Sequence, residues 1–189
     1  MSRIQAFDPL GVQGAGRLLQ LAWLVGGVIV LAVSSRIAIP MVPVPITLQT
    51  LAVTLIGALY GWRLGGLTVA AWLLAAALGL PLLSDGAGGL EPFAGATAGY
   101  LFAFPLAAVL VGVLTARGWD GGRPVLAFAA MLAGNALCLT LGAAWLAAQI
   151  GPAVALEAGV IPFLPGAAIK SAVAAGLLVV LCRTTTRRA

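Results

Sequence analysis

The chain has 189 residues, of which 62% are hydrophobic and 8% are charged, and its formal net charge is +5. Soluble domains are roughly 45–50% apolar and about 25% charged, so this composition indicates a membrane protein and excludes an ordinary water-soluble domain. Six membrane-spanning helices of about 20 residues each would account for most of the chain.

Several classes of site are also excluded. The chain has no histidine, and its two cysteines, Cys138 and Cys182, lie inside apolar runs. No zinc, haem or iron–sulfur ligand set is therefore expected, and a catalytic triad with a histidine base is ruled out. The chain also has no phosphate-binding loop motif. We expect no catalytic residue, no metal and no cofactor, and no hydrolysis of ATP by the chain itself.

Proline clusters and charged residues interrupt the apolar sequence at several points. The runs between them predict an all-α fold, a single compact bundle of six transmembrane helices over residues 18–183, flanked by an N-terminal segment (1–17) and a basic tail (184–189). The second and third helices are separated by only three residues, so they should form a tight hairpin. The expected helices cover residues 18–35, 46–60, 64–80, 94–116, 125–148 and 167–183.

The charges are distributed unequally between the two faces of this bundle. The face that holds both termini has a net charge of +6, from Arg3, Arg17, Arg63, Arg117, Arg123, Arg183, Arg187 and Arg188 against Asp8 and Asp120. The opposite face has a net charge of −1, from Arg36 and Lys170 against Asp85, Glu91 and Glu157. By the positive-inside rule both termini are expected in the cytoplasm, as in a multi-pass protein of the cell (inner) membrane. Because topology explains the basic residues, they do not indicate nucleic-acid binding.

The outer face is where a site is expected. Eight of the eleven prolines fall in its three connections, so these loops either form ordered lids or only terminate helices. The second, fourth and sixth helices begin there, and each positive dipole end would favour an anionic group by roughly 0.3–1 kcal/mol. Transporters bind substrate carboxylates with half-helices in this way.

Polar and aromatic side chains concentrate in the outer halves of the same three helices. In the second and fourth helices they recur at spacings of three and four residues, which would place them on one helix face. The set comprises Thr47, Gln49, Thr50 and Thr54 in the second helix, Thr97, Tyr100 and Phe104 in the fourth, and Lys170 and Ser171 in the sixth.

Lys170 is the most informative of these residues, because a lysine at the centre of a membrane helix costs about 2.5–3.5 kcal/mol. Either it binds a ligand, or it extends to the lipid headgroups from the first turn of its helix. Asn135 either contacts a ligand or forms a hydrogen bond between helices. Asp85 and Arg36 are further candidates, whose alternatives are a solvated loop acid and an outer anchor for the first helix.

Small residues stand four positions apart in the first expected helix, at Ala22 and Gly26. This spacing allows helices to approach closely. The face therefore serves either packing within the bundle or docking of another membrane protein.

Four segments combine proline, glycine and polar residues in a specific order: IAIPMVPVPITLQTLAV (37–53), GLPLLSDGAGG (79–89), FAGATAGYLFAF (93–104) and AGVIPFLPGAAIKSAVAA (158–175). Together they resemble the BioY family, the biotin-specific substrate-binding membrane subunits (S components) of energy-coupling-factor (ECF) transporters. The resemblance implies a six-helix subunit that captures biotin at the outer face. It also implies association with a transmembrane coupling (T) subunit and two ATPase subunits and, loosely, a docking face that includes Ala22 and Gly26.

The chain departs from the family pattern at two acidic positions. Where the family usually reads PFLPGD-x-x-K, this chain has Ala167 in place of the acid and keeps Lys170. Asp85 stands where an Asn or a similar polar residue is usual. Asp85 either takes over from the missing acid, by accepting ureido N–H bonds or pairing with Lys170, or is a loop acid without ligand contact.

The residues and the resemblance together predict a ligand that is a small, mostly apolar carboxylate with a polar head, namely biotin. Its carboxylate suits Lys170 or the helix N-termini, its ureido ring suits Asp85, Gln49 and Asn135, and its apolar part suits Tyr100 and Phe104. The alternatives are an S component for a different small vitamin and a non-transport membrane assembly protein. The candidate ligand-binding residues are Arg36, Thr47, Gln49, Asp85, Thr97, Tyr100, Asn135 and Lys170.

Overall fold

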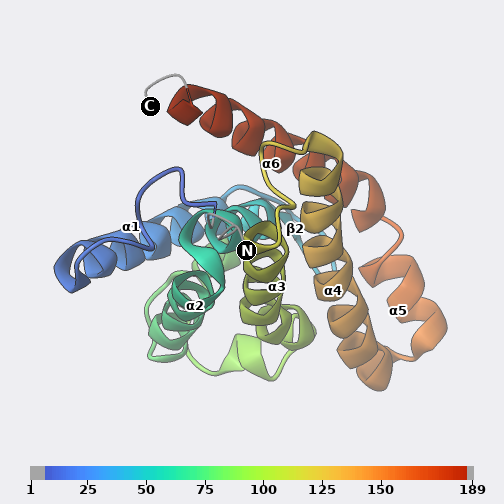
Figure 1. Ribbon diagram of the computed structural model, residues 1–189. Helices are drawn as coiled ribbons and strands as arrows, with labels where there is room; N and C mark the ends of the chain where they lie inside the picture. Colours follow the sequence, from blue (N-terminus) through green and yellow to red (C-terminus); the bar gives the residue numbers. More distant parts are fainter. Residues whose placement is uncertain (1–6, 187–189) are drawn as a thin grey trace.

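The computed structural model describes residues 7–186. The chain is mostly helical, with one two-stranded antiparallel hairpin (Figure 1). Arg3, Arg187 and Arg188, which contribute to the predicted charge asymmetry, lie outside the described residues. The elements in order are α1 (Arg17–Arg36), β1 (Ala38–Ile39), β2 (Ile46–Thr47), α2 (Gln49–Ala77), the short 3-10 turns η1 (Ser84–Gly86) and η2 (Glu91–Phe93), α3 (Ala98–Ala116), α4 (Pro124–Ile150), α5 (Pro152–Gly159) and α6 (Phe163–Thr186).

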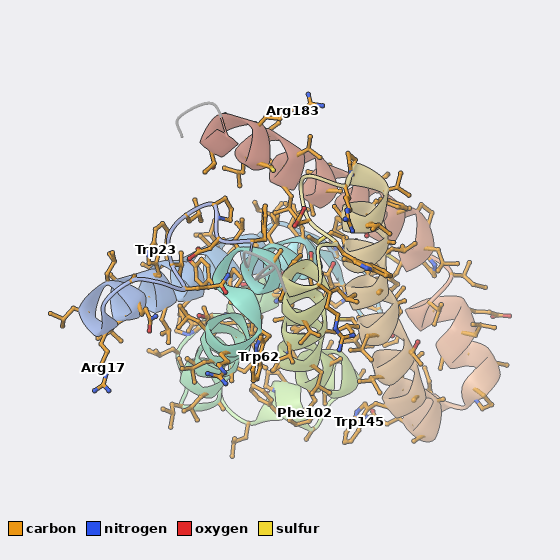
Figure 2. All side chains as sticks on the ribbon, in the orientation of Figure 1. Arg17, Trp23, Trp62, Phe102, Trp145 and Arg183 are labelled. Atoms are coloured by element: carbon orange, nitrogen blue, oxygen red, sulfur yellow. The ribbon has the colours of Figure 1, made fainter. Side chains whose placement is uncertain are left out.

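Within the described part of the chain, five helices are long and apolar enough to cross a membrane: α1, α2, α3, α4 and α6. Helices α2 and α3 are the most buried of the five, whereas α1 and α6 leave most of their surface exposed. Large apolar side chains such as Leu18, Val33 and Val180 point outward from these outer helices, and carbon-rich side chains surround the bundle in Figure 2. Such a surface is stable against lipid rather than water, so the chain is a multi-pass membrane protein.

Helix α2 contains the predicted hairpin. Its residue Gly61 has a non-helical backbone, with φ 75° and ψ 170°, a conformation that glycine adopts without steric penalty. A Cβ atom on Gly65 would lie 2.9 Å from the Gly57 Cα, although eight residues of straight helix would separate these positions by about 12 Å. The chain therefore reverses at Gly61, and the two halves of α2 pack against each other through glycines.

One end of the bundle gathers segments that are far apart in the sequence. A Cβ atom on Gly61 would lie 2.9 Å from the Gln13 Cδ, so the segment before α1 covers the α2 turn. A Cβ atom on Gly121 would lie 2.8 Å from the Cys182 Cβ, so the α3–α4 connection contacts the last turns of α6. These are the described parts of the face with a predicted net charge of +6.

The other end gathers the proline-rich connections. Trp145 Nε1 of α4 donates a hydrogen bond to the Gly95 carbonyl at 3.0 Å, which ties the connection between α2 and α3 to α4. The β1–β2 hairpin is tied to α6 at this same end. The connections therefore form ordered covers here and do more than terminate helices.

Several predicted helix boundaries are wrong at this end. Residues 46 and 47 belong to strand β2, which pairs Ile46 with Ile39 and Thr47 with Ala38, so α2 begins only at Gln49. Helix α3 begins at Ala98 rather than at residue 94. Helix α6 begins at Phe163 rather than at residue 167, and the short helix α5 precedes it. Figure 1 shows α5 at the periphery of the bundle beside α4.

Candidate ligand-binding site

A cavity of about 460 Å³ lies among the helix starts and connections at the β-hairpin end of the bundle. Its volume is in the range of small-molecule sites. Three helices contribute residues from their first turn or N-cap to its lining: Gln49 of α2, Thr97 of α3 and Phe163 of α6. The three helix N-termini that the sequence places at one face therefore meet around a single cavity.

Lys170 supplies the positive charge of the cavity. It lies two turns inside α6, because that helix begins earlier than predicted, and Nζ donates a hydrogen bond to the Thr47 carbonyl at 3.0 Å. The bond joins residues 123 positions apart and fixes the amine against the β-hairpin. Since an ammonium group has three donors, this one bond leaves two N–H groups for a ligand.

Gln49 at the start of α2 presents a hydrogen-bond donor. Its Oε1 atom accepts from Thr47 Oγ1 at 2.9 Å, and the Gln49 backbone N–H donates to the same hydroxyl at 3.3 Å. No acceptor for Nε2 is found among the described residues. Thr47, which lies in β2 rather than on the predicted helix, therefore orients Gln49 so that its amide N–H groups remain for a ligand.

Hydrogen-bond acceptors come from other walls. Asn135 of α4 donates from Nδ2 to the Met131 carbonyl at 3.0 Å and to Ser171 Oγ at 3.1 Å, so its Oδ1 atom remains as an acceptor. Asp85 and Glu91, in the connection between α2 and α3, add two carboxylates to the lining. Asp85 has φ 54°, a left-handed conformation in which Asp and Asn are enriched.

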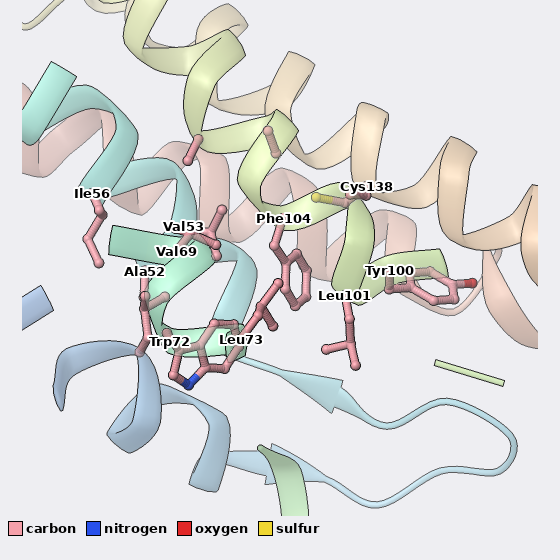
Figure 3. Close-up of a cluster of buried hydrophobic side chains, with 14 of the residues drawn as sticks. Ala52, Val53, Ile56, Val69, Trp72, Leu73, Tyr100, Leu101, Phe104 and Cys138 are labelled. Atoms are coloured by element: carbon pink, nitrogen blue, oxygen red, sulfur yellow. The ribbon is translucent and has the colours of Figure 1, made fainter. Parts of the chain in front are cut away.

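The remaining lining is apolar and aromatic. Figure 3 shows Tyr100, Leu101 and Phe104 projecting from α3, with Cys138 on the neighbouring helix α4. The Tyr100 ring stacks on Phe163 with 6.3 Å between ring centroids. The Tyr100 hydroxyl donates to the Gly159 carbonyl at 2.8 Å, so it is the ring that is available to a ligand.

Arg36 differs from the other predicted site residues, because it does not line the cavity. Its Nη2 atom donates to the Pro81 carbonyl at 2.6 Å. Beside it, Ser35 Oγ and Trp72 Nε1 both donate to the Leu82 carbonyl, at 2.7 and 3.2 Å. Arg36 therefore anchors the connection that carries Asp85, which is close to the anchoring alternative considered from the sequence.

The structure brings the other seven predicted site residues together on one cavity: Thr47, Gln49, Asp85, Thr97, Tyr100, Asn135 and Lys170. Asp85 and Lys170 line it without forming an ion pair with each other among residues 7–186. The pairing alternative for Asp85 is thus absent from this structure.

Sequence reasoning left several lining residues out of the candidate list. Thr50 and Phe104 stood on the polar faces that were identified, whereas Val44, Leu83 and Phe163 carry no signal that distinguishes them from ordinary core residues. Ala167, noted for the missing acid, lines the cavity one turn before Lys170.

Ala22 and Gly26 of α1 do not pack within the bundle. Ala22 is exposed, and a Cβ atom on Gly26 would meet no atom within 4 Å. The adjacent Gly27 behaves differently, because a Cβ there would lie 2.6 Å from Thr68 Cγ2. Gly27 therefore serves internal packing, and Ala22 and Gly26 form an open strip on the outside of α1.

Comparison with known proteins places this chain in a family. The family model described as "BioY family" matches residues 9–187. The biotin transporter BioY of Rhizobium etli is 38% identical over 155 residues, covering 78% of this chain and 83% of the relative. The probable biotin transporter BioY of Pyrococcus horikoshii is 33% identical over 143 residues, covering 76% and 83%.

A solved structure with a similar fold supports the same family assignment. The crystal structure of the S-component for biotin from an ECF-type ABC transporter matches with a TM-score of 0.74 and 27% sequence identity, covering 88% of this chain and 92% of that one. The fold thus agrees with the family that the four sequence segments resemble. The chain belongs to the BioY family.

Proposed function

We propose that this chain captures biotin in the cavity described above and delivers it across the membrane as the S component of an ECF-type transporter. Support comes from the relatives named as biotin transporters and from the similar fold of a biotin S-component. The observation that carries the proposal is the composition of the cavity, in which a lysine amine, amide groups and carboxylates surround apolar walls.

Biotin and this cavity are complementary group by group. Lys170 and the N-terminal turn of α2 supply donors and positive potential for the carboxylate. The Asp85 and Asn135 side-chain oxygens are acceptors for the two ureido N–H groups. Tyr100, Leu101 and Phe104 offer apolar surface to the thiophane ring and the aliphatic chain. Thr97 bonds weakly to the Pro92 carbonyl, at 3.4 Å, and its hydroxyl remains at the cavity wall.

The proposal includes a topology and partners. The halves of α2 before and after Gly61 count as two spans, which gives six spans with α1, α3, α4 and α6, with both termini in the cytoplasm of the inner (cell) membrane. The cavity then opens outward. Because the chain has no nucleotide-binding motif, energy comes from two ATPase subunits through a T subunit that docks on Ala22 and Gly26.

Equilibrium binding of labelled biotin to the purified chain tests this function. We expect saturable binding of one biotin per chain, which unlabelled biotin displaces and an excess of thiamine or riboflavin does not. Displacement by another vitamin but not by biotin would identify an S component of different specificity. Absence of binding to any of them would favour the non-transport alternative.

A further inference from the structure

Thr50 carries an unusual hydroxyl group. Its Oγ1 atom is the one buried side-chain nitrogen or oxygen in the described part of the chain that has no hydrogen-bond partner. The buried helix hydroxyls of Ser34, Thr54, Thr68 and Thr115 donate to a backbone carbonyl three or four residues earlier, and that of Ser171 accepts from Asn135 Nδ2. Native proteins leave few such atoms unpaired, so this exception requires an explanation.

The helix boundary explains why Thr50 has no internal partner. Thr50 is the second residue of α2, so the carbonyls three and four residues earlier belong to strand β2. Ile46 pairs there with Ile39, and the Thr47 carbonyl accepts from Lys170 Nζ. A threonine deeper in the helix would donate to one of the two carbonyls three and four residues earlier. For Thr50 these two carbonyls belong to a strand, so they do not have the helical position that such a bond requires.

The position of Thr50 indicates what would satisfy the hydroxyl. Thr50 lines the same cavity as Gln49 and Lys170, and all three lie within one helical turn of Thr47 or in contact with it. Lys170 and Gln49 can donate hydrogen bonds into the cavity, at the positive end of α2. The Thr50 hydroxyl is itself covered by protein atoms, so it reaches a ligand there by rotation about its Cα–Cβ bond. A group of donors around a helix start favours a carboxylate.

We propose that the Thr50 hydroxyl donates a hydrogen bond to the carboxylate of the bound ligand and so contributes to its selection. This inference rests on the proposed function, in which that ligand is biotin. In the ligand-free chain the hydroxyl is buried and unpaired, which costs fold stability, and it gains its partner when the side chain turns toward the ligand. Binding and stability should therefore change in opposite directions when the hydroxyl is removed.

The test compares Thr50→Val with Thr54→Val. Valine has nearly the shape of threonine without the hydroxyl, and Thr54 is a matched control one turn further along α2, bonded to the Thr50 carbonyl at 2.9 Å and absent from the cavity lining. The readouts are the Kd for biotin, the Kd for its uncharged carboxamide, and the apparent Tm of the ligand-free protein. Thr50→Ser, which keeps the hydroxyl, completes the set.

For Thr50→Val we expect the biotin Kd to rise about tenfold to a hundredfold, with a smaller rise for the carboxamide because a neutral acceptor forms a weaker bond. The apparent Tm should rise by about 2–4 °C, because a buried unpaired hydroxyl has been removed. Thr50→Ser should bind like the unsubstituted chain. Thr54→Val should keep the biotin Kd within about threefold, with an unchanged or lower Tm.

Three results would overturn the inference while leaving biotin binding intact: an unchanged Kd in Thr50→Val, an equal loss in Thr54→Val, or a lower Tm together with the weaker binding. Equal losses for biotin and its carboxamide would overturn the assignment to the carboxylate. An unsubstituted chain that does not bind biotin would instead overturn the proposed function, and this inference with it.

Discussion

Lys170 shows how a charged side chain is accommodated in an apolar bundle. A lysine inside a membrane helix is costly, and here its amine meets a backbone carbonyl of the β-hairpin rather than a carboxylate. A neutral acceptor compensates an ammonium only in part. The remaining donors favour an anionic ligand, which is the physical basis of the role that we propose for this residue.

Replacing Lys170 separates the effect of its charge from the effect of its bond to Thr47. Lys170→Ala should weaken biotin binding by about 2–5 kcal/mol, or roughly 30-fold to several thousand-fold, because the ligand carboxylate loses its cation. Lys170→Arg should restore binding only in part, since a planar guanidinium replaces a compact ammonium.

Lys170→Gln is the control for this prediction. It keeps a donor for the Thr47 carbonyl but has no charge, so it should bind about as weakly as Lys170→Ala in a titration with biotin. If Lys170→Gln bound like the unsubstituted chain, Lys170 would act only by holding the β-hairpin.

Asp85 and Ala167 form a second test at the residue scale. Asp85→Asn should fold normally, because Asn also tolerates the left-handed backbone at this position. If the carboxylate accepts ureido N–H bonds, the substitution should cost about 1–3 kcal/mol of binding free energy. A loop acid without ligand contact would change binding by less than about 0.5 kcal/mol.

Ala167→Asp should restore binding only in the Asp85→Asn background. Ala167 lies three residues before Lys170 on the same face of α6, so an acid there would reach the lysine. In the unsubstituted background this acid would add a further carboxylate to a cavity that already holds Asp85 and Glu91, which opposes an anionic ligand, so the single Ala167→Asp variant should bind biotin no better than the unsubstituted chain. In the Asp85→Asn background the number of carboxylates is unchanged. Improved binding by that single variant would show that Asp85 does not replace the missing acid.

Among the elements, those with a clear sequence signal were predicted and those defined by tertiary contacts were not. The three-residue break at Gly61, Trp62 and Arg63 marked the α2 reversal, and long apolar runs marked α1, α3 and α4. The β1–β2 hairpin has only two residues in each strand, which is too short for an alternating pattern. Helix α5 has eight residues and lies between prolines, so its sequence is equally typical of a loop.

In the candidate site, too, the features with a local sequence signal were predicted and those that depend on tertiary contacts were not. Polar residues in an apolar chain are conspicuous, so seven lining residues were found from the sequence. The long hydrogen bonds that position them, such as that from Lys170 to Thr47, join segments far apart in the chain and leave no local pattern. Arg36 has the same polar character but a structural contact, and composition alone does not distinguish the two roles.

The open strip on α1 gives a prediction at the level of one helix. The double variant Ala22→Leu with Gly26→Leu should fold and bind biotin normally, because neither position contacts the bundle. It should reduce ATP-dependent biotin uptake by more than about tenfold in cells that supply the coupling subunits, because bulky side chains prevent close helix approach.

Val25→Leu is the matched control on α1, since Val25 is half exposed and not part of the small-residue strip. Its uptake should remain normal. Equal uptake by the double variant and this control would place the partner contact elsewhere on the molecule.

At the scale of the whole molecule, the charge count and the structure agree on which segments share an end. The turn at Gly61, the α3–α4 connection and the end of α6 lie together, as the +6 face requires. The proline-rich connections cover the cavity at the other end. The two groupings agree because the positive-inside rule counts charges over the loops on one side of the membrane. The fold brings those same loops together at one end of the bundle.

Accessibility to a membrane-impermeant thiol reagent in intact cells tests this orientation. Leu90 lies in the connection over the cavity and is 73% exposed, whereas Arg123 is an exposed residue of the α3–α4 connection. Leu90→Cys should be modified from outside and Arg123→Cys should react only after the membrane is permeabilised, with the unsubstituted chain as the background. The reverse pattern would place the cavity on the cytoplasmic side.

A structure of this chain with biotin bound would show directly where and in which orientation the ligand lies. The proposed function predicts biotin within the cavity at the β-hairpin end, with its carboxylate within hydrogen-bonding distance of Lys170 Nζ, and the further inference adds a bond from the Thr50 hydroxyl to the same carboxylate. Its ureido ring should face the Asp85 and Asn135 oxygens. Biotin bound outside this cavity, or bound inside it with its carboxylate directed at Asp85 and away from Lys170, would contradict the account.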